Sequence, residues 1–183
     1  MLLKRRLASI LCTVPFFVFL LSSAAQAQEL RFDHNHTFAE VVDYLNQVVR
    51  NYPEIARLHN IGQSYEGRDL LVLEVTNQST GDGLSKPGFW IDGNLHASEV
   101  MGAEVTLKNI DVLVTQYGSD PFITNLIDTR TIYLMPKLNP DGSDYYLMNP
   151  DGMRSSVRPH DSDWDGALDE DPPEDLDGDG NIA

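Results

Sequence analysis

Cysteine is nearly absent from this 183-residue sequence, whose single cysteine is Cys12. An intramolecular disulfide needs two thiols, so no such bond can stabilise the chain. Any comparable cross-link between its loops would have to come from a bound metal ion.

Apolar runs long enough to cross a bilayer are absent too. The longest run covers residues 10–21, whereas a membrane-spanning helix needs about 20 apolar residues. This run follows the basic residues 4–6 and precedes the small-x-small site Ala25-Gln26-Ala27. These features predict a signal peptide over residues 1–27 that is cleaved after Ala27, with export to the periplasm or the exterior. We expect no stable membrane insertion after cleavage, although an uncleaved anchor is the alternative.

Basic residues are scarce, with 13 Lys and Arg against 28 Asp and Glu. Three of the 13 lie in the predicted signal peptide, so the exported part has a formal charge of −18. This charge argues against nucleic acid and anionic membrane surfaces as partners. Residues 161–183 contain ten acidic side chains and no basic one, so a local feature causes much of the imbalance.

The hydrophobic pattern between residues 37 and 135 predicts helices and strands that form an α/β sheet. Apolar residues recur at helical spacing over 37–52, and again from Val100 to Tyr117, where Gly118 suits the end of a helix. Strands are expected over 56–64 and 68–76, joined by a hairpin turn, and over 88–92 and 130–135. The run 88–92 is almost wholly apolar, which predicts a strand buried on both faces.

His96 and Glu99 lie three residues apart, directly after the predicted strand 88–92. Five His and nine Glu in 183 residues give roughly 0.25 such pairs by chance, so the spacing alone proves little. Their place predicts that both side chains extend the buried stripe of the following helix at the carboxyl end of a strand, where ligands of α/β sheets bind. An imidazole and a carboxylate suit zinc. The alternative is a histidine held by a local hydrogen bond beside a glutamate that favours a helix N-terminus.

Three further motifs accompany Gly93-Asn94-Leu95-His96-Ala97-Ser98-Glu99: Gln63-Ser64-Tyr65-Glu66-Gly67-Arg68, Leu138-Asn139-Pro140-Asp141-Gly142 and Met153-Arg154-Ser155. In this order and spacing, the four motifs resemble the first half of a zinc carboxypeptidase of the carboxypeptidase A type. The resemblance covers residues 38–160, and four ordered motifs are more specific than one. It implies an α/β fold with a mixed sheet and flanking helices (phosphorylase/hydrolase-like), and a catalytic domain whose first part is residues 28–160.

The resemblance also implies roles for particular residues. His96 and Glu99 would be two of the three protein ligands of a catalytic zinc, and Arg154 would stabilise the oxyanion of the tetrahedral intermediate. The family's Trp-Arg pair is Met153-Arg154 here, and Arg158 lies four residues on, so the choice between the two arginines stays open. Both could instead be surface charges that face the acidic tail. The third zinc ligand and the general-base glutamate have no match in this sequence, so we expect a fragment that is inactive alone.

The acidic segment 161–183 resembles aspartate-rich calcium loops. Acidic residues occupy positions 1, 3, 5 and 9 of one loop, with Gly166 at position 6, and a second loop begins in the same way. Pro172 stands where an EF-hand has glutamate, so the pattern fits short calcium repeats better than a helix-loop-helix sensor. The predicted calcium ligands are Asp161, Asp163, Asp165, Asp169, Asp175, Asp177 and Asp179. A disordered acidic run is the alternative.

The sequence therefore supports one main hypothesis and two alternatives. The main one is a secreted zinc metallocarboxypeptidase that acts on the C-termini of peptides or proteins, with calcium as a structural ion. A non-catalytic exported calcium-binding module on a decayed enzyme scaffold is the second. The third is a related zinc amide hydrolase that acts on acylated amino acids.

Overall fold

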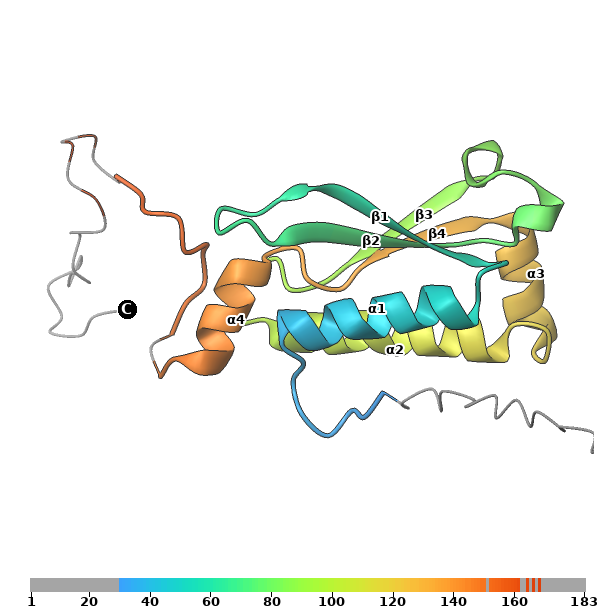
Figure 1. Ribbon diagram of the computed structural model, residues 1–183, viewed down its shortest axis with the longest axis horizontal. Coiled ribbons are helices and arrows are strands. Elements are labelled where there is room, and N and C mark those ends of the chain that lie inside the picture. Colours follow the sequence, from blue (N-terminus) through green and yellow to red (C-terminus); the bar gives the residue numbers. More distant parts are fainter. Residues whose placement is uncertain (1–29, 151, 162–163, 165, 167, 169–183) are drawn as a thin grey trace, which may run out of the picture.

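The computed structural model describes residues 30–150, 152–161, 164, 166 and 168 (Figure 1). Along the described chain, one helix is followed by three strands, two helices, a fourth strand and a last helix. Two short 3₁₀ helices, Gln78–Thr80 and Gly83–Ser85, lie in the loop before the third strand. The bounds are α1 Phe38–Asn51, β1 Ala56–Gln63, β2 Asp69–Val75, β3 Gly88–Asp92, α2 Val100–Gln116, α3 Pro121–Thr129, β4 Thr131–Met135 and α4 Pro140–Met148.

The four strands form one mixed sheet in the order β1-β2-β4-β3. β2 runs antiparallel to both β1 and β4, whereas β3 and β4 are parallel, with Asp92 opposite Met135. A parallel pair needs a crossover connection, and α2 and α3 lie in the chain between β3 and β4. The predicted α/β fold with a mixed sheet and helices beside it is thus confirmed, and the parallel pair brings two strand ends to one edge.

Helices α1 and α2 both lie beneath the sheet in Figure 1 and cover one of its faces. Thr37 caps α1 and, with Glu40, forms the reciprocal capping box that fixes the start of the helix. The expected stripe of α2 is buried from Val100 to Val114, and Gly118 has the left-handed φ of 80° that suits a helix end. The main core residues contributed by these helices and the sheet are Val41, Leu45, Val48, Leu73, Val75, Leu107, Ile110, Val114, Ile132 and Leu134.

One strand prediction is wrong. β3 was expected to be buried on both faces, but Phe89 is 63% and Trp90 48% exposed. The physical reason is the strand order, because β3 is the edge of the described sheet and pairs only with β4. An apolar run indicates a strand that can be buried on both faces. Whether the strand is buried depends on which other elements pack beside it.

Two helices have no counterpart among the elements expected from the sequence. α3 begins where Asp120 accepts hydrogen bonds from the N–H groups of Phe122 and Ile123, with Pro121 in the first turn. α4 begins inside the segment expected to be a turn, where Asn139 caps the helix by accepting from the N–H of Gly142. Residues typical of turns are also residues that start helices.

The predicted signal peptide, residues 1–27, lies outside the described residues. Its cleavage and the export that it implies stay predictions. Within the described part of the chain, no helix combines the length and apolar character needed to span a membrane.

Candidate functional site

The candidate site lies at the edge of the sheet where the parallel strands β3 and β4 end. Residues 93–99 follow β3, and residues 136–139 follow β4. The two segments are joined directly, because Leu138 donates its N–H to Gly93 O at 3.0 Å and Asn139 donates to Asn94 O at 3.1 Å. Functional groups of α/β sheets commonly gather at such a carboxyl edge.

His96 and Glu99 contact each other there, with His96 Nδ1 2.9 Å from Glu99 Oε1. The sequence had predicted that these two side chains extend the buried stripe of α2, and this prediction is wrong. α2 begins at Val100, and the pair lies in a preceding turn closed by Glu99 N–H to His96 O at 3.1 Å. The side chains are 34% and 57% exposed, so they face the surface. The predicted contact between His96 and Glu99 is therefore present, but a turn brings the two side chains together and not a helix.

Arg154 lies beside this pair. The N–H of Ala97 donates to Arg154 O at 2.9 Å, which fixes the segment around 153–156 against the loop of His96. His96, Arg154 and Arg158 line one surface pocket with the hairpin turn around Ser64. Among the residues that the structure describes, neither guanidinium has an ion-pair partner, so both can meet a ligand in the pocket.

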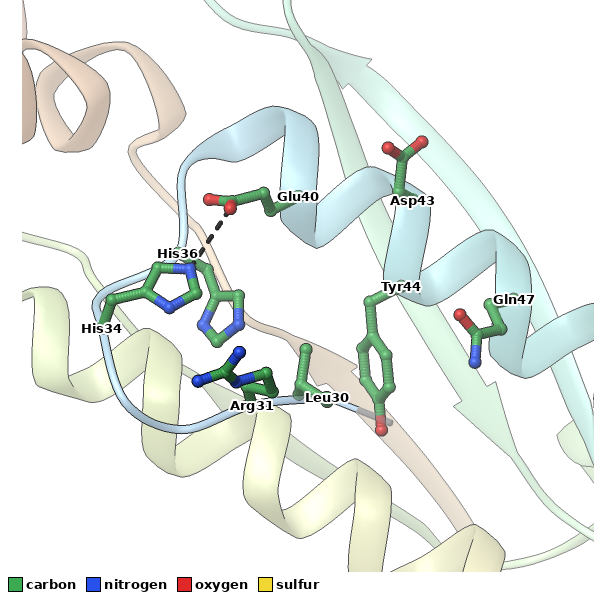
Figure 2. Close-up of a pocket in the computed structure, with 8 residues that line it drawn as sticks. All are labelled: Leu30, Arg31, His34, His36, Glu40, Asp43, Tyr44 and Gln47. Carbon is green, nitrogen blue, oxygen red and sulfur yellow. Dashed lines mark hydrogen bonds and ion pairs between the residues drawn. The ribbon is translucent and has the colours of Figure 1, made fainter. Parts of the chain in front are cut away.

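Three other described histidines, His34, His36 and His59, lie away from this pocket. His34 and His36 line a second pocket near the start of α1, where His34 contacts Glu40 (Figure 2). His36 is buried against Glu104, and His59 on β1 contacts Glu74 at 2.8 Å. Within the described ranges, no group of three or more His, Cys, Asp or Glu side chains could hold a metal ion together.

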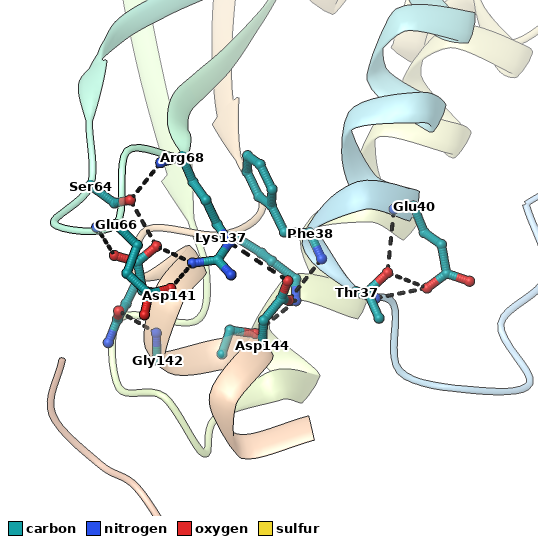
Figure 3. Close-up of polar contacts among 12 residues, drawn as sticks. Thr37, Phe38, Glu40, Ser64, Glu66, Arg68, Lys137, Asp141, Gly142 and Asp144 are labelled. Atoms are coloured by element: carbon teal, nitrogen blue, oxygen red, sulfur yellow. Dashed lines mark hydrogen bonds and ion pairs between the residues drawn. The ribbon is translucent and has the colours of Figure 1, made fainter. Parts of the chain in front are cut away.

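Asp141 fixes the hairpin turn at the rim of the pocket (Figure 3). Its carboxylate accepts from Ser64 Oγ at 2.7 Å, from Glu66 N–H at 2.9 Å and from Arg68 Nη1 at 2.7 Å. Burial raises the pKa of Asp141, but the hydrogen bonds from Glu66, Ser64 and Arg68 outweigh it and hold the pKa below its ordinary 3.8. From the sequence, Asp141 was only one member of a motif with no role of its own, although an acidic residue after proline is a signal for a helix start.

Behind this turn, Lys137 is almost fully buried. Its Nζ donates to Ser143 Oγ at 2.7 Å and to Asp144 Oδ1 at 3.2 Å, and Asp144 Oδ1 also accepts from Phe38 N–H at 2.8 Å. Burial lowers the pKa of Lys137 below its ordinary 10.5, against the attraction of Asp144. These contacts, which also appear in Figure 3, join α1, α4 and the end of β4 behind the site.

The predicted calcium segment is described only at its start. Asp161 Oδ1 accepts from the N–H of Trp164 at 2.6 Å, and Oδ2 accepts from the N–H of Gly166 at 2.9 Å. A loop therefore closes on the carboxylate of Asp161. The other predicted ligands, Asp163, Asp165, Asp169, Asp175, Asp177 and Asp179, lie outside the described residues.

Comparisons with known proteins point to one family. Residues 41–167 match the family model described as zinc carboxypeptidase. Human carboxypeptidase D is 35% identical over 136 residues, which are 74% of this chain and 10% of that protein. Mouse carboxypeptidase M is 36% identical over 146 residues, which are 80% of this chain and 32% of that protein.

The fold agrees as well. The crystal structure of the carboxypeptidase A from Helicoverpa armigera superimposes with a TM-score of 0.63 at 27% identity, over 74% of this chain and 32% of that one. The chain thus spans about a third or less of each of these relatives. Because the family model matches more than half of the chain, the protein belongs to the zinc carboxypeptidase family.

Proposed function

We propose that this chain forms the first part of the catalytic domain, residues 28–160, of an exported zinc metallocarboxypeptidase that removes C-terminal residues from peptides or proteins. The observation that carries the proposal is the His96–Glu99 contact of 2.9 Å, in which His96 also lines a pocket with Arg154. Other histidine–glutamate contacts occur in this chain, as at His59 and Glu74. The pair at 96 and 99 differs because it lies at the carboxyl edge of parallel strands beside exposed guanidinium groups.

The donor set fits zinc. An imidazole nitrogen and a carboxylate oxygen are ligands that zinc prefers, and both are exposed enough for an ion to reach them. Because Nδ1 is the ring nitrogen that faces Glu99, it is the proposed coordinating atom. Bound zinc would act as a Lewis acid that polarises the scissile carbonyl and lowers the pKa of a water molecule. A third protein ligand and a general-base glutamate are proposed to follow residue 183.

Arg154 is proposed to stabilise the negative charge that develops on the carbonyl oxygen. A guanidinium donates several hydrogen bonds and keeps its charge at any pH of interest. The hydrogen bond from Ala97 N–H to Arg154 O fixes the backbone of Arg154 beside His96. Arg158 lines the same pocket, but the part of the chain that the structure describes shows no such bond from Arg158 to the His96 loop. This difference favours Arg154 over Arg158.

The decisive test compares two histidines in the full chain. We expect His96→Ala to lose bound zinc and the release of C-terminal residues from peptides. The matched control is His59→Ala, which breaks a histidine–glutamate contact of similar length away from the pocket and should keep both. Equal zinc content in wild type and His96→Ala would contradict the proposal. Hydrolysis of acylated amino acids without any action on peptides would favour the amide hydrolase, and absence of zinc from a folded wild type would favour the calcium-binding module.

Calcium is proposed as a structural ion of the aspartate-rich segment 161–183. The proposal rests on the alternation of aspartates with glycine in the sequence, and on the loop that closes on Asp161. A cation bound by such a loop would offset the repulsion between Asp161 and the acidic residues that follow.

A further inference from the structure

Asn94 has an unusual conformation directly before the candidate zinc ligand. Its backbone φ is 57°, in the left-handed region that few residues other than glycine adopt and that asparagine tolerates best. Its side chain is buried, with the residue only 2% exposed. Nδ2 donates to His96 O at 2.9 Å and to Ala97 O at 3.1 Å. One amide group therefore holds the carbonyl groups of His96 and Ala97, the first two residues of the turn that ends at Glu99.

The other end of this amide is unsatisfied. Asn94 Oδ1 is buried and has no hydrogen-bond partner among the described residues. A flipped amide would place Oδ1 against two carbonyl oxygens, which repel it, so the observed orientation is the one the site requires. A buried acceptor without a donor costs stability, as does the left-handed backbone. Such costs at one residue are typical of functional sites.

The backbone of Asn94 is fixed from two sides. Asn94 O accepts from Asn139 N–H at 3.1 Å, which ties it to the segment after β4. On the opposite side Gly93 contacts Gly102 of α2 so closely that a Cβ on Gly93 would lie 2.2 Å from Gly102 O. The amide of Asn94 therefore projects from a rigid support. Because Asn94 donates to His96 O, the imidazole is held in a defined position relative to the sheet and to α2.

Ala97 extends this hold to the arginine segment. Its carbonyl accepts from Asn94 Nδ2, and its N–H donates to Arg154 O at 2.9 Å. A change at Asn94 would therefore move both the imidazole and the proposed oxyanion-stabilising group.

We propose that Asn94 is a positioning residue, which holds the His96 turn in the geometry that binds zinc and aligns it with Arg154. This inference rests on the proposed function, because it concerns the same metal site. Residues that orient metal ligands typically change metal affinity by about 10- to 100-fold when they are replaced.

The test measures zinc affinity of the full chain by competition with a chromophoric chelator. Asn94→Gly keeps the left-handed backbone accessible but removes the amide, and Asn94→Asp puts a carboxylate oxygen against the two carbonyl groups. We expect both variants to bind zinc about 10- to 100-fold more weakly. Cobalt substituted for zinc should give visible absorption bands that shift in both variants, because the ligand geometry changes.

The matched control is Asn77→Gly. Asn77 also uses its side chain at both ends, since Nδ2 donates to Asp128 at 2.7 Å and Oδ1 accepts from Ser79 N–H at 2.9 Å, but it lies in the loop after β2. We expect it to lower the melting temperature without changing zinc affinity or the cobalt bands. Wild-type zinc affinity in a folded Asn94→Gly or Asn94→Asp variant would overturn the inference. A folded wild type that binds no zinc would instead overturn the proposed function beneath it.

Discussion

Arg68 and Asp141 are 73 positions apart in the sequence, yet Arg68 Nη1 lies 2.7 Å from Asp141 Oδ1. Arg68 belongs to the hairpin turn between β1 and β2, and Asp141 to the first turn of α4. Asp141 is 3% exposed and also accepts from Ser64 and Glu66. The contact therefore joins two separate motifs of the sequence into one wall of the candidate site.

We expect Asp141→Asn to destabilise the fold by about 3 kcal/mol, because it removes a buried charge that three donors of the hairpin turn require. Chemical denaturation measures the change in the free energy of unfolding. Asp69→Asn is the control, because Asp69 is exposed on the same hairpin and should change stability by less than about 0.5 kcal/mol. A similar loss in both variants would show that the charge of Asp141 has no special role.

The same carboxylate makes stability depend on pH. Since the pKa of Asp141 in the folded protein is below its ordinary 3.8, the ionised form stabilises the fold fully at higher pH. This contribution is lost as pH falls below about 4 and through the folded-state pKa. Between pH 7 and pH 3, the free energy of unfolding should fall more in the wild type than in Asp141→Asn. Chemical denaturation of both proteins at the two pH values measures this difference. Parallel pH profiles for the two proteins would contradict the assignment.

Lys137 and Asp144 form a buried pair in which the two partners are not equivalent. Asp144→Ala leaves the buried ammonium of Lys137 with Ser143 alone, and frees the N–H of Phe38, so we expect a loss of about 4 kcal/mol. Lys137→Met should lower the free energy of unfolding by less. In this variant Asp144 still accepts from the N–H of Phe38 and still has the guanidinium of Arg68 as a neighbour, at 3.9 Å. Urea denaturation of both variants at pH 7 checks the order. A larger loss in Lys137→Met would refute it.

Gly93 should tolerate no side chain. A Cβ there would lie 2.2 Å from the backbone oxygen of Gly102, so Gly93→Ala must separate the His96 loop from α2. We expect a loss of stability of about 2 kcal/mol together with weaker zinc binding. Gly118→Ala is the matched control, because Gly118 has φ 80° but nothing within 4 Å of a Cβ. It should lose only backbone strain energy, about 1 kcal/mol, and keep the wild-type zinc affinity.

Calcium binding can be followed through Trp164, which is 87% exposed. The chain has two tryptophans, so Trp90→Phe leaves Trp164 as the sole reporter. We expect its fluorescence to respond to calcium with a midpoint on the order of 10⁻⁴ to 10⁻³ M. Asp161→Ala should abolish the response. No change up to about 10 mM calcium in the Trp90→Phe protein would exclude the proposed ion.

The sequence by itself determined the local features whose causes are local. Apolar spacing defined α1 and α2, the stretch from Gln63 to Arg68 marked a hairpin turn, and four ordered motifs were enough to indicate the family. The spacing of His96 and Glu99 made their contact possible, since a tight turn brings the backbones of residues three positions apart close together. Each of these results depends on residues that are neighbours in the chain.

Tertiary structure decided what depends on distant partners. The apolar run of β3 could not reveal that its strand lies at an edge, because strand order is set by pairing with β4, about 40 residues on. Nor could the sequence show that Asn94, itself in a left-handed conformation, donates to the carbonyl groups of His96 and Ala97. Its backbone is supported by Gly102 and Asn139. Burial and hydrogen-bond geometry arise only when segments pack, and they decide which polar residues become structural supports of the site.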